Sequence, residues 1–110
     1  MGLTKTDIFS KSQNNLAEVC KVLGHPARIA ILEHISNTNS CICGDLVEEI
    51  GLAQATISQH LRELKKINLI QGTIEGTSVC YCINQQNWQK IAFLISKFLN
   101  QKIHSDIDCC

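Results

Sequence analysis

Residues 45–70 read DLVEEIGLAQATISQHLRELKKINLI, and this stretch decides the fold of the chain. Its first part predicts a short helix that ends at Gly51 and buries the apolar side chains of Leu46, Val47 and Ile50. Its second part predicts a helix from about Gln54 to Ile67, because apolar residues recur there at steps of three and four (Ile57, Leu61, Leu64 and Ile67). A short helix, a turn with glycine and an amphipathic helix predict a helix-turn-helix.

The opposite face of the second helix carries amide, hydroxyl, imidazole and cationic side chains. The first three kinds of group both donate and accept hydrogen bonds, as the reading of base edges in the major groove requires. Cationic groups further along suit phosphate contacts, which position a protein on DNA without reading its sequence. We therefore expect DNA contacts from Gln54, Ala55, Thr56, Ser58, Gln59, His60, Arg62 and Lys65. A solvated face on an ordinary surface helix is the alternative.

The composition indicates one domain in a chain of 110 residues. The formal net charge is zero, so a DNA-binding surface would have to be a local cluster of basic residues. No apolar run approaches the ~20 residues that span a bilayer, and the first 15 residues contain no signal-peptide core. We expect a cytoplasmic protein with no membrane partner.

Outside this stretch, the pattern predicts two helices before it and a hairpin and a helix after it. Helices are expected at about 16–24 and 26–35, strands at 69–75 and 79–84, and a last helix at 86–102. We expect a flexible arm at 1–11, a domain at 12–102 and a tail with two cysteines at 103–110. The predicted fold is mainly α with a small β-hairpin. Its order, α-α-α-α-β-β-α, is that of a winged helix-turn-helix.

The predicted last helix has more apolar residues than one small domain can cover: Trp88, Ile91, Ala92, Leu94, Ile95, Phe98 and Leu99. The excess predicts a partner helix, most simply from a second copy of the chain. We therefore expect a dimer.

Four segments resemble the ArsR/SmtB family of metal-sensing winged-helix repressors. They are LGHPARIAILEHI at 23–35, CICGDL at 41–46, QATISQHLRELKK at 54–66 and LIQGTIEGTSVCYCI at 69–83. The resemblance implies a homodimer joined through its first and last helices, and no enzymatic activity or organic cofactor. It also implies that the dimer represses an operon by binding double-stranded operator DNA, and leaves it when a metal or metalloid binds.

The chain departs from the family pattern at three places. Gly44 separates the C-x-C pair from Asp45-Leu46, and a one-residue shift on a helix turns a side chain by about 100°. The predicted wing around Glu75-Gly76 has no arginine, so we expect it to add little phosphate affinity. The last helix has no histidine before His104, so the zinc site of some members finds no match.

Seven cysteines are the unusual feature of the composition. Cys41 and Cys43 are expected at the start of the third helix, where the helix dipole favours the thiolate. As(III) needs three thiolates, so we expect a site for As(III) or another thiophilic ion from Cys41, Cys43, Cys109 and Cys110. Alternatively, Cys41 and Cys43 are two small apolar residues of the core. The alternative for Cys109 and Cys110 is a C-terminal tail with no function. Cys20 is expected in the core, and Cys80 and Cys82 on a half-buried strand face.

The sequence thus favours a dimeric repressor that a thiophilic metal or metalloid releases from its operator. One alternative keeps the DNA binding and makes disulfide formation the trigger. A thiol oxidoreductase is disfavoured, because the chain has no C-x-x-C motif and no βαβ pattern. A winged helix that binds protein rather than DNA is compatible with the neutral charge.

Overall fold

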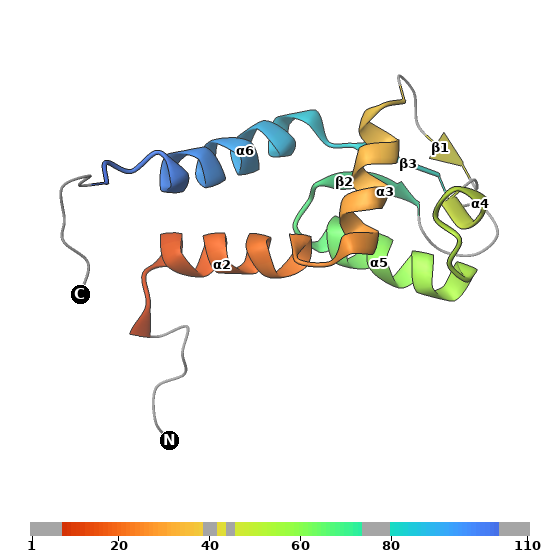
Figure 1. Cartoon of the computed structure of the whole chain (residues 1–110), viewed down its shortest axis with the longest axis horizontal. Coiled ribbons are helices and arrows are strands. Elements are labelled where there is room, and N and C mark those ends of the chain that lie inside the picture. The colour runs from red at the N-terminus through yellow and green to blue at the C-terminus, as the bar shows by residue number, and fades with distance from the viewer. Residues whose placement is uncertain (1–7, 39–41, 44–45, 74–79, 104–110) are drawn as a thin grey trace.

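The computed structural model describes residues 8–38, 42–43, 46–73 and 80–103. Their elements are, in chain order, α2 (Lys11–Leu23), α3 (Pro26–Ser36), β1 (Ile42–Cys43), α4 (Leu46–Ile50), α5 (Gln54–Lys66), β2 (Ile70–Thr73), β3 (Cys80–Ile83) and α6 (Gln85–Leu99). This order confirms the winged helix-turn-helix. Figure 1 shows α3, α4, α5 and the sheet gathered into one body, from which α2 and α6 extend to the same side.

The first helix begins earlier than the apolar pattern predicted, at Lys11 instead of about Leu16. Ser10 and Gln13 form a capping box: the Gln13 N–H donates to Ser10 Oγ at 3.1 Å, and the Ser10 N–H donates to Gln13 Oε1 at 2.9 Å. These two bonds satisfy backbone donors that a helix start leaves unpaired. The second helix begins as expected, with Pro26 in its first turn and His25 Nδ1 accepting from the Ala27 N–H.

The sheet contains the predicted hairpin and one strand that was not predicted. β3 is the middle strand, antiparallel to β2 on one side and to β1 on the other. Cys43 therefore lies in a strand, and its expected place at the start of the third helix is wrong, because that helix begins only at Leu46. A two-residue strand depends on backbone hydrogen bonds to distant residues, which periodicity cannot reveal. Cys41 and the wing tip at 74–79 lie outside the described residues.

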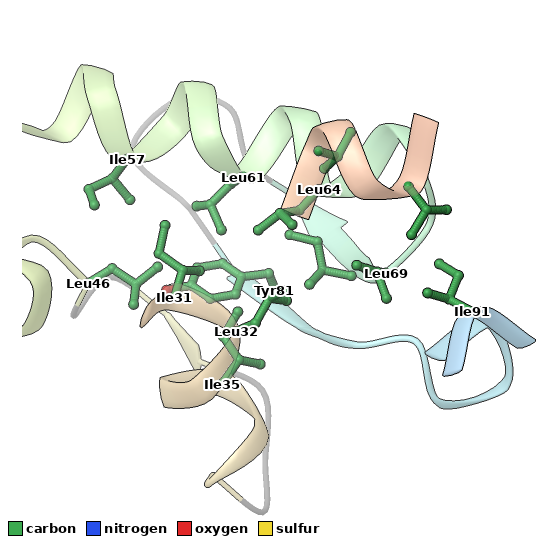
Figure 2. Packing of buried hydrophobic residues seen from close by; sticks show 13 residues of the cluster. Ile31, Leu32, Ile35, Leu46, Ile57, Leu61, Leu64, Leu69, Tyr81 and Ile91 are labelled. Carbon is green, nitrogen blue, oxygen red and sulfur yellow. The ribbon is translucent and has the colours of Figure 1, made fainter. Parts of the chain in front are cut away.

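The core lies where α5 packs on α3 and the sheet. The apolar stripe predicted for α5 is confirmed for Ile57, Leu61 and Leu64, which are buried. They point from α5 toward Tyr81 of β3, which is 1% exposed, and Ile31 of α3 (Figure 2). Because α2, α3, α4 and β2 all contact α5, the helix is held with its other face turned away from the core.

Gly72 allows the two wing strands to approach closely. Its φ is +130°, and a Cβ placed on it would overlap the carbonyl oxygen of Cys80. Only glycine meets both conditions without strain.

In the described part of the chain, no helix has both the length and the apolar character needed to cross a membrane.

Candidate nucleic-acid interface

The face of α5 opposite the core is polar and open to solvent. Six of the eight residues predicted to contact DNA are exposed there: Gln54, Ala55, Thr56, Gln59, Arg62 and Lys65. The helix begins after Ala53, which provides no side-chain cap for the N–H groups of the first turn. Uncapped N–H groups at the positive end of a helix dipole attract anions such as phosphate. Donors, acceptors and cations thus line one side of a rigid helix.

Ser58 and His60 do not lie on that open face, and the prediction that they are exposed is wrong. Ser58 is 8% exposed and its Oγ accepts a hydrogen bond from Gln54 Nε2 at 3.0 Å. His60 is 7% exposed and its Nδ1 accepts from Arg28 Nε at 3.1 Å. The start of α3 contacts this side of α5, so the buried side of α5 is wider than its apolar stripe. Ser58 is buried beneath Gln54 and orients the amide of Gln54 through this hydrogen bond.

His25, Arg28 and His60 form a polar cluster that ties α5 to α3. The His25 and His60 rings have centroids 4.4 Å apart, and Arg28 also donates from Nη1 to the Val22 carbonyl at 3.1 Å. Burial lowers the pKa of His60, and electrostatic interactions with His25 and Arg28 lower it further. A neutral His60 keeps Nδ1 free of a proton and able to accept from Arg28. The cluster therefore helps to hold α5 in position against α3.

The basic residues late in α5 differ in their partners. Lys65 Nζ donates to the Gly72 carbonyl at 2.6 Å, and this hydrogen bond joins α5 to β2. Lys66 pairs with Glu63 at 3.0 Å, and this hydrogen bond lowers the pKa of Glu63. Arg62 makes no hydrogen bond or ion pair with any residue that the structure describes. Arg62 is thus the cation on this face most available to a phosphate.

The cysteines whose backbone the structure describes lie in α2, β1 and β3. Cys43 stands opposite Cys80 in the β1–β3 register, and Cys80 is exposed and disulfide-bonded. Cys82 is a half-buried free thiol, with Gln71 Nε2 3.8 Å from its Sγ. Cys20 is exposed, so its expected place in the core is wrong. The expected ligands Cys41, Cys109 and Cys110 lie outside the described residues. Among the described ones, no three Cys, His, Asp or Glu side chains are grouped to hold a metal.

The segment that contains α3, α4 and α5 has counterparts in known proteins. Residues 25–71 match the family described as "Bacterial regulatory protein, arsR family". An uncharacterised HTH-type transcriptional regulator of Methanocaldococcus jannaschii is 34% identical over 82 residues, which cover 74% of this chain and 91% of that protein. The chain belongs to the ArsR family. This ArsR-family chain is also 32% identical, over 75 residues, to the arsenical resistance operon repressor of Staphylococcus xylosus, covering 68% and 71% of the two chains.

The fold has a counterpart in a solved structure. NolR from Sinorhizobium fredii superposes with a TM-score of 0.60 at 22% identity, covering 89% of this chain and 95% of NolR. The match shows that α2 and α6, which lie outside the 25–71 family match, belong to the same fold. This ArsR-family chain is a DNA-binding transcriptional regulator and not an enzyme.

Proposed function

We propose that this protein represses an operon as a homodimer on palindromic operator DNA, and that a thiophilic metal or metalloid, As(III) first, releases it. The observation that carries the DNA-binding half is the exposed polar face of α5, held over a core built from α3 and the sheet. Gln54, Thr56 and Gln59 would reach base edges, with Ala55 beside them. Arg62 and Lys65 would contact phosphates. The cytoplasmic location stays a prediction.

The dimer is proposed to form through α2 and α6. Phe93, Phe98 and Leu99 of α6 are 68%, 53% and 70% exposed, whereas the same helix packs Ile91 into the core. An apolar hollow of about 250 Å³ between α6 and the body is lined by residues that include Leu23 at the end of α2. Exposed apolar side chains that gather on one element often mark an interaction surface. A second copy of these helices would cover it and set the spacing of the two α5 helices.

The effector is proposed to bind through thiolates, with Cys43 as one ligand. Three thiolates suit As(III), and the sequence offers Cys41, Cys109 and Cys110 as the others. A relative named as an arsenical resistance operon repressor supports As(III) as the first effector to test. An ion that draws Cys43 toward other sulfurs would move the segment entering α4, which packs under α5. The two half-sites of a palindrome lie at a fixed separation, so a change in the distance between the two α5 helices of the dimer would weaken operator binding.

The test is an electrophoretic shift on DNA from upstream of the protein's own gene. Reduced protein bound to that DNA is titrated separately with arsenite, Cd(II), Zn(II) and peroxide. We expect arsenite to release the DNA at the lowest concentration. Release by peroxide alone would favour the redox-triggered repressor instead, an alternative that the disulfide-bonded state of Cys80 keeps open. No shift of the upstream DNA by the reduced protein would contradict DNA-mediated repression.

Replacing the proposed ligand tests the sensing half separately. We predict that Cys43→Ser still binds the operator but needs at least tenfold more arsenite for release, because one of three thiolates is lost. Cys20→Ser is the matched control, since it removes an exposed free thiol on α2. A Cys41→Ser/Cys43→Ser protein that leaves DNA at the arsenite concentration of the parent would place the site elsewhere.

A further inference from the structure

The β1–β3 register places two cysteines directly across from each other. Cys43 pairs with Cys80, one step from the pair of Ile42 with Tyr81. Cys80 is disulfide-bonded, whereas Cys20 and Cys82 are free thiols and cannot be its partner. Cys43 is therefore the cysteine whose backbone position, as the structure describes it, faces Cys80.

Cross-strand geometry suits a disulfide between these two positions. Residues directly opposite in an antiparallel pair have Cβ atoms roughly 4.5–5.5 Å apart. A disulfide accepts Cα separations of about 4.4–6.8 Å, and the Cα separations of about 4.5–5.5 Å in such pairs lie within that range. The bond needs little movement of either strand, and Cys80 is exposed to oxidants and reductants.

We propose that Cys43 and Cys80 form a redox couple, and that closing it makes the repressor unable to respond to a thiophilic metalloid. The gating half of this inference rests on the proposed function, in which Cys43 binds the effector. A metalloid binds thiolates, and a sulfur held in a disulfide is no longer a thiolate. In the oxidised state the repressor stays on its operator in the presence of arsenite.

A hydroperoxide is the class of oxidant that closes the couple. One thiolate attacks the O–O bond to give a sulfenic acid, and the alkoxide that leaves takes a proton and becomes the alcohol. The second thiolate then attacks the sulfenic sulfur, and the hydroxyl leaves as water. Two thiols and one hydroperoxide thus give one disulfide, one alcohol and one water. A dithiol reductant reverses the bond by thiol–disulfide exchange.

A bond between Cys43 and Cys80 would close a loop of the chain that contains the helix-turn-helix. The chain between the two cysteines contains α4, α5 and β2, so the bond joins the entrance of the helix-turn-helix to the wing. The same closed loop includes Lys65 and Gly72, whose hydrogen bond already links α5 to β2. Closing the couple therefore holds the DNA-binding unit in the arrangement described above while it blocks the effector.

Peptide mapping tests the couple without any assumption about function. The full-length protein is treated with hydrogen peroxide, alkylated and digested without reductant. We expect a peptide pair linked through Cys43 and Cys80, with Cys20 and Cys82 alkylated. A bond from Cys80 to another cysteine, or no bond at Cys80, overturns the inference.

Arsenite titration of the operator complex tests the gating. We expect peroxide-treated parent to need at least tenfold more arsenite for release than reduced parent, and dithiothreitol to restore the response. Cys80→Ser should keep its arsenite response after peroxide, because Cys43 then has no partner across the sheet. Cys82→Ser, two residues along the same strand, is the matched control and should behave as the parent does.

The remaining outcomes separate the two proposals. Peroxide-treated parent that still responds to arsenite at the same concentration overturns the gating. Peroxide-treated parent that leaves the DNA without arsenite also overturns it, in favour of oxidation as the trigger. Reduced parent that ignores arsenite overturns the proposed function and the gating together, while the mapped Cys43–Cys80 bond would still support the couple.

Discussion

At the scale of single residues, the exposed amides of α5 are the groups expected to read the operator. We predict that Gln54→Ala weakens operator binding by ~1–3 kcal/mol and relaxes specificity at one base pair, because a bidentate contact is lost. Lys65→Ala should weaken all DNA sequences by similar amounts, since phosphates carry no sequence information. Fluorescence anisotropy with operator and scrambled duplexes measures both. Operator affinity unchanged in Gln54→Ala and Gln59→Ala would show that another element reads the bases.

His60 gives the chain a pH dependence that the sequence did not suggest. Its pKa lies below the usual value of 6.5 because the folded protein buries the ring beside His25 and Arg28. As pH falls below about 6.5, the unfolded chain takes up a proton on this histidine before the folded one does, so the free energy of unfolding decreases. Above that pH its contribution is constant. Urea unfolding between pH 7.5 and 5 measures the slope of the free energy of unfolding with pH, which His60→Gln should reduce.

The same residues show how far sequence reasoning reached. The spacing of Ile57, Leu61 and Leu64 was enough to find α5 and its buried stripe. Nothing in that spacing could show that His60 is buried, because its partner Arg28 is 32 residues away. A polar residue beside an apolar stripe is exposed or buried according to what packs there, and only the tertiary structure decides that.

At the scale of elements, the wing depends on one glycine. We predict that Gly72→Ala lowers the free energy of unfolding by more than ~2 kcal/mol, because its φ of +130° is strained for alanine and its Cβ would overlap β3. Gly51→Ala is the matched control: its φ is +82°, but no atom lies within 4 Å of the added Cβ. It should cost only ~1–2 kcal/mol. Equal losses in urea unfolding would contradict a close approach at Gly72.

The start of α2 and the strand β1 are two features that the apolar periodicity of the sequence does not predict. The Ser10-x-x-Gln13 signal for the start of α2 is present in the sequence, but the polar residues that follow show no apolar period, so the predicted start is too late. β1 carried no such signal, since two residues show no period and its partner β3 lies almost 40 residues further on. The position of Cys43 opposite Cys80 in the sheet could therefore not be predicted from the sequence. Sequence reasoning assigned Cys43 to a helix for the same reason.

At the scale of the whole molecule, the exposed apolar residues of α6 are the proposed basis of assembly. We predict that Phe98→Glu weakens dimerisation more than tenfold, because burying a phenylalanine in each protomer contributes about 1.5–3 kcal/mol. The side chain is 53% exposed in the single chain, so the variant should fold. Gln89→Glu adds the same charge at an exposed polar position of α6 and serves as the control.

Sedimentation at micromolar concentration measures the dimer, and the operator shift measures its consequence. A palindrome is bound by two α5 helices whose spacing the dimer sets, so Phe98→Glu should lose operator affinity together with the dimer. Non-specific binding, which needs only the basic residues of one protomer, should change less. Phe98→Glu protein that sediments as the parent does would mean that α6 is not the dimer interface. Monomeric parent with full operator affinity would remove the requirement for a palindrome.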